Sequence, residues 1–139
     1  MSASDVVTGP GTGDVVAGRQ ATSPNALIAS DRVEGTPVRR SSGEKIGTVE
    51  RLMIDKVSGK VAYAVMSFGG FLGVGERYHP LPWRMLTYDT GLGGYVVDVT
   101  REQLEGGPTY GRGETPWTSN PNFGREVYGH YGQPYGDNI

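Results

Sequence analysis

The side chains with the widest chemical range in this chain are its two histidines, His79 and His130. Neutral imidazole titrates near physiological pH, so a histidine is able to act as a general base or as a metal ligand. No second histidine lies near His79 in sequence, the closest acid is Glu76, and the chain has no cysteine. We therefore predict a structural His79, whose ring hydrogen-bonds the backbone and helps to fix the bend at Pro80 to Pro82.

No other group of reactive side chains points to catalysis. The absence of cysteine removes disulfides, thiolate nucleophiles and cysteine-based zinc sites. The acidic residues are dispersed, and Asp55 and Asp89 each begin a turn, so no carboxylate pair stands out for glycosidase-type chemistry. Nothing resembles a serine–histidine–aspartate arrangement with a nucleophile elbow. We predict that the protein is not an enzyme and that it has no catalytic, cofactor-binding or metal-binding residues and no cofactor.

A glycine-rich stretch with Gly70, Gly73 and Gly75 invites comparison with loops that cradle phosphate groups. The spacing differs from G-x-G-x-x-G, and a strand follows, whereas a phosphate cradle needs the amino end of a helix. The composition instead favours a loop that presents Phe71 and Leu72 as a contact patch. The alternative is that these two side chains tuck in and cap one end of the domain.

Aromatic residues form another group of candidates in the central region, namely Tyr78, Trp83, Tyr88 and Tyr95. Such rings are able to stack a ring-shaped ligand, but in small β domains they more often fill the core, and we favour the core. The possible interaction residues of the chain are then Phe71, Leu72, His79 and Trp83.

Apolar residues recur with a period of about two from residue 36 to residue 99, which is typical of strands. Val61 to Phe68 is the clearest case, and its alanines suit one face of a tightly curved sheet. Asp55 to Lys60 has hairpin chemistry. Because proline cannot donate to a ladder, the strand that contains Pro80 should lie at an edge, an end or a bulge. Further strands are expected at 36–39, 46–54, 77–81, 83–88 and 95–99, with a short helix from Thr100 to Gly106.

These elements predict an all-β fold, a small barrel of about six short antiparallel strands with one short C-terminal helix. The domain is expected over residues 26–108. Residues 1–25 and 109–139 are poor in apolar runs, so we predict a flexible N-terminal segment and a flexible Gly/Tyr/Pro-rich tail. The tail repeats Tyr-Gly four times. Such a repeat suits either weak contacts with a partner or a solvated chain, and we favour the solvated chain.

Charge and hydropathy narrow the classes of partner. The net charge is −2, and residues 26–108 hold ten basic and ten acidic side chains. Without a basic stripe, binding to nucleic acid is not expected. No segment approaches the roughly 18 apolar residues that a membrane-spanning helix needs, and the N-terminus lacks the features of a signal peptide. We expect a cytoplasmic protein without an integral membrane segment.

The stretch from Ile28 to Gln103 resembles the PRC-barrel family, whose fold is shared with the cytoplasmic domain of the photosynthetic reaction centre H subunit. The matching residues are the run from Gly43 to Trp83, "GEKIGTVERLMIDKVSGKVAYAVMSFGGFLGVGERYHPLPW", and "GGYVVDVTREQLEG" from Gly93 to Gly106. The segment from Gly73 to Trp83 is similar to that of the short stand-alone bacterial members. The resemblance implies a barrel-like β fold and a role in adapting or interacting, without an established enzyme activity or a link to photosynthesis.

Three functions follow as hypotheses. The first is a non-catalytic adapter that binds a protein partner or self-associates as a homo-oligomer, through a strand edge or the Phe71-Leu72 loop. The second, based on the resemblance, is a membrane-peripheral or electron-transfer-associated protein related to the reaction centre H subunit. The third is a small-ligand binder that uses His79 and the nearby tyrosines.

Overall fold

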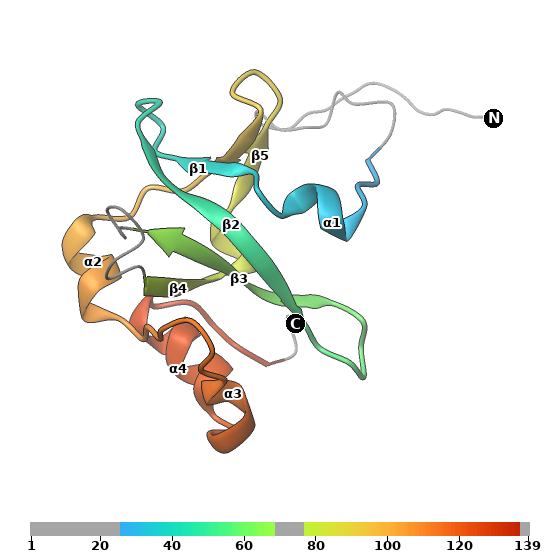
Figure 1. Cartoon of the computed structure of the whole chain (residues 1–139), viewed down its shortest axis with the longest axis vertical. Coiled ribbons are helices and arrows are strands. Elements are labelled where there is room, and N and C mark those ends of the chain that lie inside the picture. Colours follow the sequence, from blue (N-terminus) through green and yellow to red (C-terminus); the bar gives the residue numbers. More distant parts are fainter. Residues whose placement is uncertain (1–25, 69–76, 137–139) are drawn as a thin grey trace.

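The computed structural model describes residues 26–68 and 77–136, and its centre is one six-stranded sheet (Figure 1). The strand order is β4-β3-β2-β1-β6-β5. Neighbouring strands are antiparallel except β1 and β6, which run parallel. The strands are β1 (Pro37–Arg39), β2 (Lys45–Ile54), β3 (Val61–Phe68), β4 (Arg77–Pro82), β5 (Thr87–Asp89) and β6 (Gly94–Val96).

Each predicted strand region contains a strand, the region 83–88 only at its end, but the expectation of a closed, wholly antiparallel barrel is corrected. In the described residues β4 and β5 form the two ends of the sheet and do not pair with each other. The chain leaves β5 through a tight hairpin, and β6 therefore returns beside β1 in the same direction as β1. As expected for a strand with two prolines, β4 lies at an edge.

Short helices surround this sheet, where the sequence predicted only one. They are α1 (Ser30–Val33), the 3-10 turn η2 (Trp83–Met85), α2 (Arg101–Gly106), α3 (Pro116–Ser119) and α4 (Phe123–His130). The predicted helix is α2, and a capping box begins it. The Thr100 hydroxyl accepts from the Gln103 amide at 3.0 Å, and the Gln103 side chain accepts from the Thr100 amide at 2.8 Å. The expected strand at 83–88 is instead η2 followed by β5.

β3 is buried on both faces, with five consecutive buried residues from Ala62 to Met66. Its register with β4 defines two faces. The inner face carries the small or unbranched side chains opposite His79 and Leu81, and the outer face carries those opposite Tyr78, Pro80 and Pro82. On the inner face, Gly47 of β2 leaves room for Met66, because an added Cβ would lie 2.6 Å from the Met66 Cγ. The predicted small face of β3 is thus the inner face.

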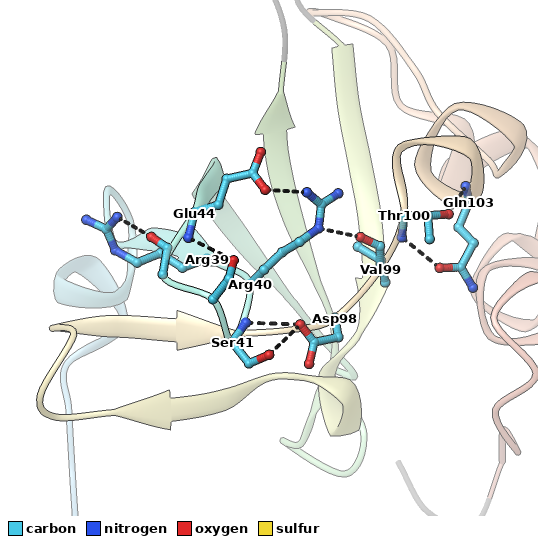
Figure 2. A network of polar contacts seen from close by, with 10 residues as sticks. Arg39, Arg40, Ser41, Glu44, Asp98, Val99, Thr100 and Gln103 are labelled. Carbon is cyan, nitrogen blue, oxygen red and sulfur yellow. Dashed lines mark hydrogen bonds and ion pairs between the residues drawn. The ribbon is translucent and has the colours of Figure 1, made fainter.

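Two loops far apart in sequence lock the parallel junction between β1 and β6 (Figure 2). The Arg40 Nε donates to the Val99 carbonyl at 2.9 Å, and Arg40 also pairs with the Glu44 carboxylate at 2.8 Å. The Ser41 amide and hydroxyl both donate to the Asp98 carboxylate, at 3.0 and 3.1 Å. These two bonds lower the pKa of Asp98, so the carboxylate stays charged where it holds the loop.

Residues 109–136 require a second correction, because a flexible tail was expected there. In the structure Tyr110 pairs with Tyr78 of β4, and α3 and α4 follow. Five apolar side chains of this stretch join the hydrophobic core: Tyr110, Phe123, Val127, Tyr128 and Tyr131. The composition hid this order because the residues that anchor it are tyrosines separated by glycines rather than an apolar run. We call residues 110–135 the C-terminal segment.

Gly94→Ala is expected to lower the free energy of unfolding by about 1–3 kcal/mol, the usual cost of overpacking. A Cβ at position 94 would overlap the Pro37 carbonyl, where β6 meets β1. Urea denaturation of the variant measures the loss. Gly129→Ala is the matched control, because it adds the same methyl group inside α4 with nothing within 4 Å. The control should be neutral or slightly stabilising, and equal losses in both variants would contradict the tight junction.

Candidate interaction site

The four predicted interaction residues do not form one site in the structure. Phe71 and Leu72 lie outside the described residues. His79 and Trp83 are described and belong to different surroundings, His79 on the inner face of β4 and Trp83 in η2.

His79 is buried, with 4% of its surface exposed, and its surroundings are structural. Its Nδ1 hydrogen-bonds the Leu104 carbonyl of α2 at 3.2 Å, and its ring packs edge-on against Phe68, with centroids 5.4 Å apart. The predicted backbone hydrogen bond is therefore present, but it holds α2 rather than the bend at the prolines. Burial lowers the pKa of His79, and Arg77 lowers it further, whereas the bond to Leu104 and the charge of Glu105 act against the shift.

Trp83 belongs to an aromatic cluster that also contains Tyr88 and Tyr95. The ring of Tyr95 lies at its centre, 5.5 Å from the Trp83 ring and 5.2 Å from the Tyr88 ring. Tyr95 is buried, Trp83 is half-buried, and Tyr88 is 42% exposed. Trp83 directly follows β4 and Tyr88 lies on β5, so the aromatic cluster joins the two ends of the sheet through side chains where no strand pairing closes it.

The aromatic cluster borders an open edge of the sheet. Within the described part of the chain, β5 has a hydrogen-bonded neighbour on one side only, which is β6. Beside Tyr88, the turn at the end of β5 exposes Leu92 by 39%, and the Asp89 carboxylate holds this turn by accepting from the Leu92 amide at 3.0 Å. Unpaired backbone groups next to exposed apolar side chains are the features of a surface that accepts another strand.

Sequence reasoning missed this site although it identified each of its aromatic residues. The prediction that the rings fill the core holds for Tyr95 and Tyr78, which are buried, and in part for Trp83, which is half-buried against the core, but not for Tyr88. Tyr78 pairs with Tyr110 on the outer face of the sheet, away from the other three rings. The sequence does not give the strand order, and it is the strand order that makes β5 an edge strand and leaves Tyr88 exposed.

A second exposed apolar site lies at the hairpin between β2 and β3. Val57 is 94% exposed there and Ile54 is 50% exposed. The hairpin has the predicted chemistry: the Asp55 carboxylate accepts from the Val57 and Ser58 amides at 2.9 and 2.8 Å, and Gly59 has φ +79°. Val57 lies in the turn between β2 and β3, outside both strands, so it offers a comparison for Tyr88 and Leu92.

A comparison with protein-family models matches residues 27–104 to the PRC-barrel domain. The match spans more than half of the chain and contains all six strands. The chain belongs to the PRC-barrel domain family. The resemblance seen in the sequence is thereby confirmed. A comparison with curated proteins finds no match.

The PRC-barrel domain ends inside α2, so the C-terminal segment lies beyond the part of the chain that the family defines. The described residues contain no group of three or more histidine and acidic side chains placed to hold a metal ion. None of their helices has the length and apolar character needed to cross a bilayer.

The burial of His79 predicts a loss of stability in mildly acidic solution. Because its pKa in the folded chain lies below the ordinary value of 6.5, the unfolded chain takes up a proton first as the pH falls through 6.5. The free energy of unfolding should therefore be highest above this pH and decrease below it. Urea denaturation at a series of pH values between neutral and mildly acidic measures the slope.

His79→Gln should remove part of this slope, because glutamine can still donate to the Leu104 carbonyl but does not titrate. His130→Gln provides the comparison, since it replaces the other histidine of the chain, whose Nε2 contacts the Gln103 carbonyl at 2.8 Å. A slope unchanged by His79→Gln would show that burial of this imidazole is not its cause.

Proposed function

We propose that this protein is a non-catalytic interaction module that binds a protein strand at the open edge of β5. The observation that carries the proposal is the difference between the two ends of the sheet. The edge of β4 is covered by Tyr110 and lacks donors at its two prolines, whereas β5 has no neighbour on its outer side among the described residues.

Addition of a partner strand at β5 would supply both binding affinity and specificity. Main-chain hydrogen bonds extend the sheet, and alternate side chains of the added strand meet the exposed side chains beside it. Tyr88 is a suitable anchor, because tyrosine buries a large apolar area and loses few rotamers on binding. Its ring already rests against the buried Tyr95, so it is partly ordered before a partner arrives.

The partner that we propose is a second copy of the chain, paired edge to edge through β5. An isologous pair uses the same surface twice, so one exposed edge is sufficient for a two-fold dimer. The domain has equal numbers of basic and acidic residues, so two copies can bring their β5 edges together without repulsion between net charges. A small domain also gains stability from association, because it buries a modest fraction of its surface alone.

The described geometry does not favour the small-ligand alternative, because the side chains that would bind such a ligand already have partners within the chain. The Nδ1 of His79 is already occupied by the Leu104 carbonyl, and the nearby Tyr78 ring packs against Tyr110. A membrane-peripheral or electron-transfer role has no observation of its own in the structure. Neither is therefore offered as a second function.

The test is sedimentation equilibrium of the full chain over a range from micromolar to millimolar concentration. Wild type should show a reversible dimer, and Tyr88→Glu and Leu92→Asp should each weaken it by roughly tenfold or more, because each places a charge on both copies at the two-fold interface. Circular dichroism should remain that of wild type, since both side chains are partly exposed.

Val57→Asp is the matched control. It places the same charge on a more exposed apolar side chain at the far hairpin, and the dimer should persist. A chain that stays monomeric throughout the range, or that dimerises equally well in all three variants, would refute pairing through β5.

A further inference from the structure

The C-terminal segment covers the outer face of β3 and β4 and adds no neighbour strand beyond the short bridge at Tyr110 (Figure 1). Tyr78 and Tyr110 exchange both backbone hydrogen bonds, at 2.8 and 3.1 Å, and their rings lie 5.4 Å apart. Phe123 of α4 then packs edge-on against Tyr63 of β3, with centroids 6.2 Å apart. These aromatic contacts resemble the way an amphipathic peptide lies in an apolar groove.

One residue fixes where the C-terminal segment docks. The Tyr128 hydroxyl donates to the Ala62 carbonyl of β3, and the hydroxyl oxygen itself accepts from the Trp83 backbone amide. Burial raises the pKa of Tyr128, and the bond from Trp83 acts in the opposite direction. A buried hydroxyl that bonds two separate elements gives direction to contacts that are otherwise apolar.

The C-terminal segment has little helical stability of its own. α3 has four residues, and α4 has eight, of which Gly124 and Gly129 disfavour a helix. Isolated helices of this length are not stable in water. The order of this segment therefore comes from docking, as for a peptide that folds when it binds.

The outer face of β3 and β4 belongs to the part of the chain that matches the family. The C-terminal segment, which covers this face, lies beyond the match. All six strands lie within residues 27–104, whereas the buried side chains of the C-terminal segment begin at Tyr110. The link between them is short, so the segment is held at a high local concentration and competes strongly with any other occupant.

We propose that the outer face of β3 and β4 is a binding surface for an aromatic helical segment, which the C-terminal segment fills within its own chain and which the same segment of a second copy can enter. This inference concerns a surface separate from β5. It stands or falls independently of the proposed edge pairing.

The experiment adds a peptide of residues 109–136, labelled at its amino end with a fluorophore, to the full-length protein and follows fluorescence anisotropy. Wild type should bind the peptide weakly, because its own segment occupies the face. Full-length Tyr128→Ala should bind it roughly tenfold tighter or more, since a larger fraction of the chains has a free face. Tyr128→Phe, which loses the hydroxyl and keeps the ring, should give an intermediate affinity.

Two controls accompany this measurement. Ser119→Ala in the full-length chain changes an exposed residue of the same segment and should leave peptide affinity at the wild-type value. A peptide carrying Tyr128→Ala should not bind to any of the proteins, because it lacks the hydroxyl and ring that reach Ala62 and Trp83.

Circular dichroism and hydrogen exchange of the same variants decide between docking and integral structure. The proposal requires that Tyr128→Ala keep the sheet folded while amides of α4 lose protection. If the sheet unfolds together with the segment, the segment is an integral part of one cooperative core and the proposal is wrong. It is equally wrong if the variant stays folded and binds the peptide no tighter than wild type.

Discussion

The parallel pairing of β1 with β6 is the constraint on which the rest of this structure depends. It brings the first and last strands of the domain together, and it requires that Gly94 lie against the Pro37 carbonyl without a side chain between them. The bonds from Arg40 to Val99 and from Ser41 to Asp98 hold the two chain segments together just beyond the carboxyl ends of β1 and β6. With β6 fixed there, its hairpin partner β5 must end the sheet, and the chain after β6 must lead α2 across the inner face, where the Leu104 carbonyl meets His79.

The middle of the sheet then needs a cover on each side. β3 buries both of its faces, which no single layer of a small domain achieves. α2 and the residues before it cover the inner face, and the C-terminal segment covers the outer one. The two covers touch where the His130 Nε2 contacts the Gln103 carbonyl beside the His79 bond to Leu104. Gly107 permits this contact, since a Cβ there would lie 2.8 Å from the His130 Nε2.

Local features were predictable from the sequence, and distant pairings were not. The period of two located β2 and β3, and the Asp55 turn and the Thr100 cap were identified from their own residues. Pro80 indicated a strand edge, end or bulge, and β4 is an edge strand. These signals act within a few residues of each other. The parallel direction of β6, the open ends and the exposed position of Tyr88 depend on strand order, which side-chain alternation does not encode. The C-terminal segment was missed because its anchors, three tyrosines with Phe123 and Val127, are interspersed with glycines and polar residues, and their burial depends on a face contributed by β3 and β4.

The same topology explains why the association that we propose is placed at one end of the sheet. An exposed strand edge invites pairing, and proteins block such edges with prolines or with covering segments. β4 has both, with Pro80 and Pro82 in its ladder and Tyr110 bound to Tyr78. β5 has neither among the described residues, and its edge ends in a turn that exposes Leu92. A sheet that closed fully would have no edge at all, so the association that we propose depends on the open end of the sheet beside Trp83 and Tyr95.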